Sequence, residues 1–181
     1  MSTFHESLLD LDLRQRERYR HKARARRSHL AAGWGDKNPS FTCKHCGQYV
    51  STEPLLSGVR HRNHCPYCLW SRHVDLVQAG DRLCACKGGM RPVGLTLKAE
   101  RKKYGDGNGE LMLVHQCVEC VAFSINRIAA DDLPDQLLAA FRASLQPNAL
   151  MAYRLAGRGI RLLDANDEEL VHARLFGWVE R

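Results

Sequence analysis

The chain has 181 residues, enough for one ordinary domain or two small ones, and 44% of them are apolar, so a packed core is possible. Its formal net charge is +7, with nine Lys/Arg against five acids in residues 1–42, twelve against seven in 43–130 and six against eight in 131–181. The start lacks the basic and apolar regions of a secretory signal, and no run approaches the roughly eighteen apolar residues of a membrane span, which excludes a membrane protein.

We therefore expect a cytoplasmic protein with no membrane partner and no small-molecule substrate. The basic first two thirds of the chain favour nucleic acid as the partner.

Residues 5–32 are predicted to form one helix, because they contain no Pro or Gly and are rich in good helix formers. Basic side chains cover most of its circumference, and their mutual repulsion would be relieved by a phosphate backbone. We expect RNA or DNA contact here, with a solvated or disordered arm as the alternative. The basic residues are Arg14, Arg16, Arg18, Arg20, Lys22, Arg24, Arg26 and Arg27. A Gly-, Pro- and Asn-rich linker, residues 33–42, follows, so residues 1–40 are predicted to be an arm and linker.

The eight cysteines fall into four close pairs, a spacing typical of metal ligands rather than of disulfides in a reduced compartment. The first pairs, in CKHC and CPYC, are eighteen residues apart, a spacing typical of a zinc ribbon. The pairs CAC and CVEC predict a second site across a hairpin. The predicted ligands of the two zinc ions are Cys43, Cys46, Cys65, Cys68, Cys84, Cys86, Cys117 and Cys120.

Three alternatives stay open at these sites. His115 lies two residues before Cys117 and could replace Cys84 or Cys86 as a ligand. A cross-brace could replace the sequential pairing of the turns, and iron could replace zinc. Because four thiolates close the coordination shell of each ion, both sites are predicted to be structural, and we expect no enzyme activity.

Residues 93–99 and 110–117 are predicted strands, joined by a turn-rich loop, and basic residues gather near its tip at Arg101, Lys102 and Lys103. Residues 133–181 are predicted to be a small α-rich module. A helix begins near Asp131, Asp132 and Pro134, with Leu137, Leu138, Phe141 and Leu145 on one face. Pro147 begins a second helix, which Gly157 and Gly159 end. Residues 159–164 read as a short strand and residues 167–180 as a last helix.

Residues 62–66 spell RNHCP, and the segments SRHVD, GDR, CKGGMRP, VHQCVEC and NRIAADD follow at residues 71–75, 80–82, 86–92, 114–120 and 126–132. In these segments the chain resembles the RNHCP domain family of bacteria, over about residues 41–132. The resemblance implies a zinc-ribbon character and no established activity. The fold class expected overall is α+β: a zinc-ribbon β domain with two four-cysteine sites, a long basic N-terminal helix and a mostly helical C-terminal module.

The polar motif residues have two interpretations. In the first interpretation they form hydrogen bonds within the domain. Asn63 or His64 would then bind the loop backbone, His73 would pair with Asp75 or Asp81, and Arg127 would lie over Asp131 or Asp132. Phosphate contact is the second interpretation for Arg60, Arg62, Arg72 and Arg127, because a guanidinium presents a planar fork of donors to phosphate oxygens. Tyr67 and Trp70 could stack on a base, although burial of Trp70 against the ribbon is favoured.

The function predicted from the sequence is a structural-zinc protein that binds RNA, docking on ribosomal RNA and ribosomal proteins. A DNA-binding transcription accessory protein is the first alternative and a zinc-dependent nuclease the second.

Overall fold

In a computed structural model, residues 40–98 and 109–177 are described. The predicted helix at 5–32, its eight basic residues and most of the linker at 33–42 lie outside the described residues. So do the basic residues of the hairpin tip, Arg101, Lys102 and Lys103.

An antiparallel sheet of four strands forms the centre of the described fold, in the order β3-β4-β5-β6. The strands are β3 (Ser71–Arg72), β4 (Gly89–Lys98), β5 (Glu110–Cys117) and β6 (Phe123–Arg127). The two predicted strands are confirmed as β4 and β5, which pair directly from Met90↔Cys117 to Lys98↔Glu110. A second sheet contains only β1 (Phe41–Thr42) and β2 (Tyr49–Val50), which flank the first cysteine turn.

The helices of the C-terminal third begin close to where the sequence predicts. They are α3 (Pro134–Ala143), α4 (Ala149–Ala156), capped by the Asn148 side chain, and α5 (Glu168–Phe176), which follows the 3-10 turn η1 (Ala165–Asp167). A further single turn, α2 (Pro54–Ser57), lies between the first two cysteine pairs.

The predicted strand at residues 159–164 is wrong. This segment runs beside β4, where Leu163 N–H donates to Leu95 O at 2.9 Å and the Thr96 hydroxyl donates to Arg161 O at 2.6 Å. The segment is joined to β4 by one backbone hydrogen bond and one side-chain hydrogen bond, which do not form the repeated backbone pairing of a β-strand.

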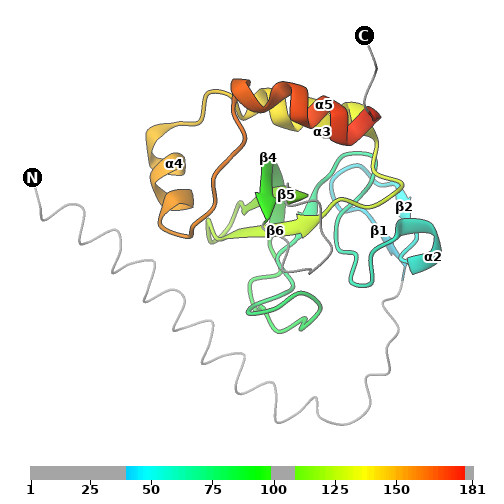
Figure 1. Cartoon of the computed structure of the whole chain (residues 1–181). Coiled ribbons are helices and arrows are strands. Elements are labelled where there is room, and N and C mark those ends of the chain that lie inside the picture. The colour runs from blue at the N-terminus through cyan, green and yellow to red at the C-terminus, as the bar shows by residue number, and fades with distance from the viewer. Residues whose placement is uncertain (1–39, 99–108, 178–181) are drawn as a thin grey trace, which may run out of the picture.

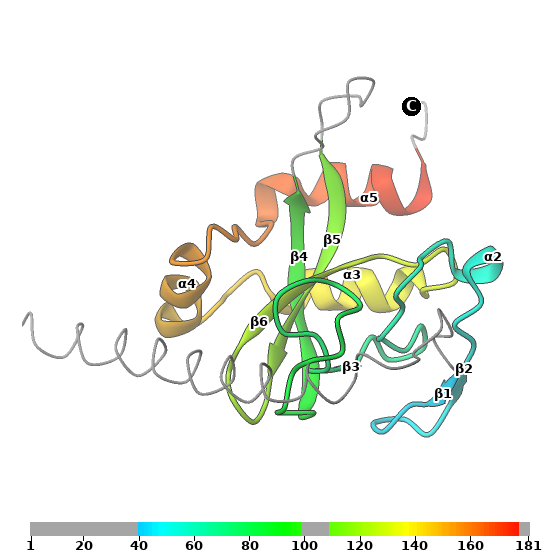
Figure 2. The same cartoon turned by 90° about the horizontal axis from the view of Figure 1, so that it is seen from below.

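The core lies between the sheet and the C-terminal helices. Leu95, Leu111 and Leu113 from β4 and β5 pack with Phe141 of α3 and Val171 of α5, all of them buried. Figure 1 shows α3 and α5 together over one side of the sheet, and Figure 2 shows α3 crossing the direction of β4 and β5. Helices α3 and α5 therefore share one core with β4 and β5, and β5 ends at Cys117.

Close packing between β4 and the end of α3 requires a glycine. Gly94, at a register shift in β4, has φ +144°, and a Cβ there would lie 2.6 Å from Ser144 Cβ. Ser144 is itself held in place, because its hydroxyl donates to Phe141 O at 2.6 Å. The absent side chain lets the helix end approach the strand.

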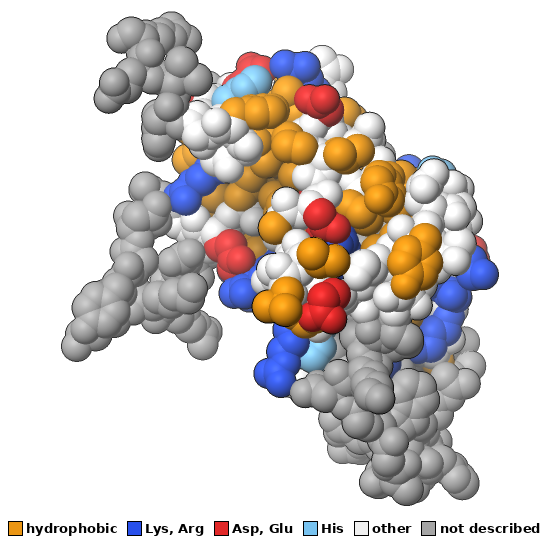
Figure 3. Space-filling view, turned by 90° about the vertical axis from the view of Figure 1, so that its right-hand side faces the viewer, with side chains coloured by type: hydrophobic (Ala, Val, Ile, Leu, Met, Phe, Trp, Pro, Cys, Tyr) orange, Lys and Arg blue, Asp and Glu red, His pale blue; other side chains and the backbone are white. Residues whose placement is uncertain are grey.

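The surface beside α2 is largely apolar. Leu55 and Leu56 of α2 expose 92% and 63% of their area, and Figure 3 shows apolar side chains gathered on this side of the molecule.

Among the described residues, no helix is long and apolar enough to cross a membrane.

Candidate metal centres

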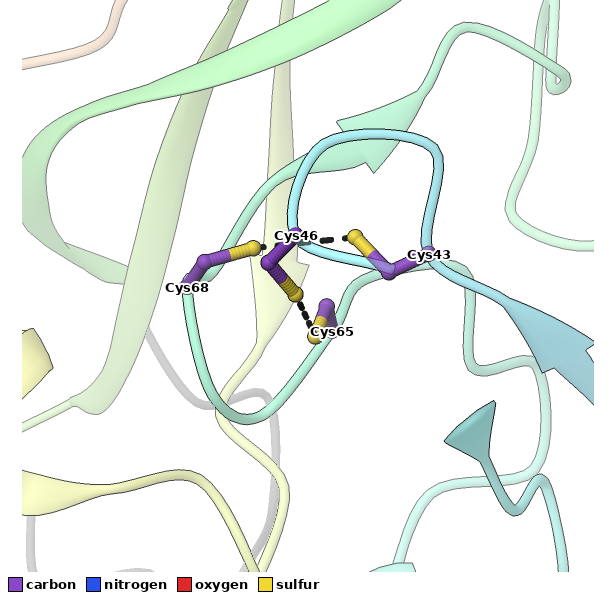
Figure 4. A group of neighbouring side chains, drawn as sticks. All are labelled: Cys43, Cys46, Cys65 and Cys68. Atoms are coloured by element: carbon purple, nitrogen blue, oxygen red, sulfur yellow. Dashed lines mark hydrogen bonds between the residues drawn. The ribbon is translucent and has the colours of Figure 1, made fainter. Parts of the chain in front are cut away.

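The first centre brings together the four predicted thiols, Cys43, Cys46, Cys65 and Cys68, with all donor atoms within 4.8 Å of one another. Cys43 Sγ lies 3.6 Å from Cys68 Sγ, and Cys46 Sγ lies 3.6 Å from Cys65 Sγ (Figure 4). Four sulfurs at about 2.3 Å from a tetrahedral ion would be about 3.8 Å apart, whereas disulfide sulfurs are about 2.0 Å apart. The geometry fits a shared ion.

Three of the cysteine pairs sit on the same kind of turn. The backbone N–H of the first cysteine donates to the carbonyl five residues on, as in Cys43 to Gln48, Cys65 to Trp70 and Cys117 to Ala122. The residue after the second cysteine has positive φ: Gly47 (75°), Leu69 (60°) and Val121 (52°). Left-handed backbone is costly for leucine and more so for a β-branched valine. The turn geometry therefore outweighs local preference at Leu69 and Val121.

The second centre brings Cys86, Cys117 and Cys120 together with His73, again with donor atoms within 4.8 Å of one another. Cys86 Sγ lies 3.6 Å from Cys117 Sγ, and His73 Nδ1 lies 3.1 Å from Cys120 Sγ. Burial alone would lower the pKa of His73, but hydrogen bonds to Cys117, Cys84 and Cys86 raise it to about 10.

The prediction of four cysteine ligands at this centre is therefore wrong for one residue. His73 lies with the three thiols in place of Cys84. Cys84 is fully buried beside the set, and its N–H donates to Val74 O at 2.8 Å. A single residue separates Cys84 from Cys86, so this pair does not form the turn of the other three. His73 enters instead from the end of β3, held by its N–H bond to Gly88 O at 2.9 Å.

Gly88 shows how tightly the backbone closes on the second centre. A Cβ there would lie 3.1 Å from Cys117 Sγ and 2.6 Å from Glu119 Cγ. The loop that carries Cys86 can approach Cys117 because this position has no side chain.

His115 does not join the metal set, so that alternative is wrong. Its Nε2 lies 2.6 Å from Leu69 O and its Nδ1 lies 2.8 Å from the Asn126 amide, which uses both ring nitrogens. Complete burial and the nearby His64 lower the pKa of His115 to about 3. The ring is thus a neutral hydrogen-bonding group between Leu69 and Asn126.

Sequential pairing of the turns is confirmed where the structure tests it. Cys43 and Cys46 meet Cys65 and Cys68, and Cys86 meets Cys117 and Cys120. The cross-brace is wrong, because β4 and β5 pair Met90 with Cys117 and so bring the later turns together.

A buried network lies beside the first centre. Arg62 donates to both oxygens of Asp131 at 2.7 and 2.6 Å and to Asp132 Oδ1 at 3.1 Å. His64 Nε2 lies 2.8 Å from Asp132 Oδ2. Asp132 also accepts from Ala129 N–H at 2.8 Å. Burial of these charged groups is possible because each one is paired with an opposite charge and hydrogen-bonded.

The prediction that Arg62 contacts nucleic acid is therefore wrong. Its side chain is 0% exposed, and its Nε donates to His64 O at 3.1 Å, so phosphate cannot reach it in this fold. The interpretation of His64 as an internal group is confirmed, although its partner is a carboxylate rather than the loop backbone. Asn63 contributes its carbonyl, which accepts from the Ser71 hydroxyl at 2.9 Å.

The loop between His73 and Cys84 is held by two carboxylates. Asp75 accepts from Gly80 and Arg82 N–H, and Asp81 accepts from four backbone N–H groups, those of Leu76, Val77, Gln78 and Leu83. Burial opposes ionisation of Asp81, yet these bonds hold its pKa below the usual value. The expected pairing of His73 with Asp75 or Asp81 is not what the structure shows, since His73 faces the thiols.

The remaining predicted contact residues lie on the surface. Arg60 is exposed, and Arg72 is exposed with Nη2 3.0 Å from Lys87 O. Arg127 pairs with Glu110 at 3.0 Å, not with Asp131 or Asp132 as expected. Trp70 is half-buried and stacks on His45, with ring centroids 4.1 Å apart and planes 7° from parallel.

Comparison with known proteins gives one family. The model of the RNHCP domain matches residues 38–138, which is more than half of the chain. No curated protein matches the chain, and no solved structure matches it.

Proposed function

This chain belongs to the RNHCP domain family, and we propose that it is a zinc-stabilised protein that binds RNA, with ribosomal RNA as the target. The observation that carries the proposal is positive charge outside the metal centres and the buried network. Residues 14–29 alone contain eight Lys/Arg and one Glu. Lys44, Arg60 and Arg72 are exposed in the described part of the chain.

Zinc is the ion that best suits both donor sets. Four thiolates, or three thiolates and an imidazole, in close tetrahedral contact are the usual ligands of structural zinc. Each set has four protein donors, which leaves no position for a water nucleophile. We therefore assign the ions a role in folding and no role in a reaction.

The surface near β3 supports RNA rather than an inert basic face. Trp70 directly precedes β3 and Arg72 is exposed within it, with the buried Ser71 between them. The stacked His45 ring follows exposed Lys44 directly. Aromatic rings with flanking basic side chains are the elements that bind single-stranded nucleic acid, by stacking on bases and contacting phosphates.

The first experiment measures binding of the zinc-loaded full chain to ribosomal RNA over a range of salt concentrations. We expect affinity to fall steeply with salt, and deletion of residues 1–32 to remove most of this slope. Lys44→Ala and Arg72→Ala should each reduce the slope of log binding constant against log salt concentration by about one. Arg142→Ala is the matched control, because Arg142 is a similarly exposed arginine on α3 and its loss should leave binding unchanged.

Two outcomes would contradict the proposal. The first is no binding to ribosomes or RNA at about 50 mM salt, a condition that favours phosphate contacts. The second is tighter binding to duplex DNA than to RNA in direct competition, which would favour the transcription accessory role. Co-sedimentation of the native protein with ribosomes would support ribosomal RNA as the target.

A further inference from the structure

The His45 side chain is an exposed aromatic ring that is already held in one orientation. It stacks on Trp70, with ring centroids 4.1 Å apart and planes 7° from parallel. His45 is exposed, whereas Trp70 is half-buried. Within residues 40–98 and 109–177, this stack is the only ring contact of the His45 side chain, and the side chain forms no hydrogen bond there. In this part of the chain, one face of the imidazole is therefore left for a ligand.

Trp70 supports this ring from below. Its carbonyl accepts from Cys65 N–H at 2.9 Å, which fixes its backbone to the turn of the second cysteine pair. Its six-membered ring lies against Gly89, where an added Cβ would be 3.3 Å from Cζ3 and 3.6 Å from Cε3. Because Gly89 and His45 both lie against the indole, Trp70 offers less open surface to a base than His45 does. We therefore expect a base to stack on His45 and not on Trp70.

The stack joins the two cysteine turns of the first centre. His45 lies between Cys43 and Cys46, and its N–H donates to Cys43 Sγ at 3.4 Å. Trp70 follows Cys68, a ligand from the other turn, by two residues. A side chain fixed by both a turn and a stack loses little conformational freedom when a ligand binds, and this preorganisation favours affinity.

Each ring of the stack has an exposed cation close to it along the chain. Lys44 directly precedes His45, and Arg72 follows Trp70 by two residues. Positive side chains beside a stacking ring suit the phosphates on either side of a bound base. A base inside a duplex has its faces covered by its neighbours, so only an unpaired base can offer a face to a protein ring. The site therefore fits a single strand.

We propose that the open face of His45 stacks on one unpaired base of single-stranded RNA, with Trp70 as the positioning residue beneath it and Lys44 and Arg72 contacting the flanking phosphates. This inference rests on the proposed RNA binding and narrows it. The basic residues of 14–29 would contact the phosphates of any RNA, paired or unpaired. His45 adds a contact that only an unpaired segment can make, so the preferred target is a loop, a bulge or a free end.

The test measures binding of the zinc-loaded full chain to a single-stranded oligouridylate of about 12 nucleotides and to its duplex with oligoadenylate. His45→Ala should weaken single-strand binding by about 5- to 150-fold, the range expected for loss of one base stack, and should leave duplex binding unchanged. The dependence of affinity on salt should also stay the same, because the ring contacts a base and not a phosphate. His45 is outside both donor sets, so the variant should retain two ions.

Tyr67→Ala is the matched control. Tyr67 is an exposed ring at the equivalent position of the other turn, but no ring is stacked on it in the described part of the chain, so its loss should leave binding unchanged. His45→Tyr keeps a ring and should bind like the unchanged protein, whereas His45→Gln should not, and this pair carries the test if His45→Ala folds poorly. Trp70→Leu should weaken single-strand binding selectively, and Trp70→Phe should restore it.

Two results would overturn the stacking site while leaving the proposed RNA binding intact. One is salt-dependent RNA binding that is equally strong in His45→Gln and His45→Tyr. The other is an equal loss of single-strand and duplex affinity in His45→Ala. Absence of any RNA binding by the full chain would overturn the proposed function and the stacking site together.

Discussion

His64 Nε2 lies 2.8 Å from Asp132 Oδ2, across 68 residues of sequence. Through this contact the segment that enters the Cys65–Cys68 turn of the first centre is attached to the segment that begins α3. Leu133 N–H, donating to Pro66 O at 3.2 Å, adds a backbone bond at the same junction. The residues that give the family its name therefore connect a metal centre to the helical core.

Asp132→Ala should destabilise the protein by about 3–5 kcal/mol, because it leaves the buried Arg62 and His64 without their shared carboxylate. Urea unfolding of the metal-loaded protein would measure the change. Asp131→Ala is the control, since the Asp131 side chain is 40% exposed, and it should cost about 1 kcal/mol. Equal losses in the two variants would show that burial does not set the energy of this network.

Removal of the ions should unfold the sheet as well as the cysteine turns. Cys117 ends β5, whose residues 111–117 are all buried, so its turn cannot open without disturbing the core. Structural zinc contributes on the order of 10 kcal/mol in small domains. Circular dichroism and thermal unfolding in excess chelator would measure the loss across residues 41–130, and full retention of both signals would contradict the prediction.

Gly94→Ala should destabilise by about 2–4 kcal/mol, combining left-handed backbone strain with crowding against Ser144. Gly159→Ala separates the two causes, because Gly159 has φ +67° but nothing within 4 Å of its added Cβ. That control should cost about 1 kcal/mol. Thermal unfolding of both variants tests the difference, which should disappear if β4 and the end of α3 do not touch.

Phe141→Ala should cost about 3–5 kcal/mol, since Phe141 is 0% exposed in the core shared by strands and helices. The loss should appear in helix and metal-centre signals in one transition, because Leu69, which follows Cys68 directly, packs in the same core as Phe141. Leu150→Ala, at a 49% exposed position of α4, should change stability little. Two separate transitions would instead identify the C-terminal helices as an independent module.

Local patterns predicted the elements whose causes are local. Strands β4 and β5 follow from apolar runs flanking a turn-rich segment, and α3 follows from Pro134 and the apolar face of Leu137 and Phe141. The first metal set followed from spacing, because each turn supplies two ligands from adjacent positions.

The missed residues depend on distant pairing. His73 reaches the thiols because β3 pairs Arg72 with Gly89, and no spacing rule connects it to Cys86. Arg62 has its carboxylate partners 69 and 70 residues away, so the sequence suggests an exposed arginine where the fold has a buried one. A two-residue strand such as β3 is also too short for its alternation to be recognised.

The position of β3 has a consequence for how the protein takes up its ions. Cys68 is the last ligand of the first centre along the chain and His73 is the first ligand of the second, with β3 between them. The ring of His115 contacts the Leu69 carbonyl in the same segment. An ion at the first centre therefore orders the strand that carries a ligand to the second. Loading should be cooperative, so a half-supplied sample would contain mostly filled and empty chains, with few that hold a single ion.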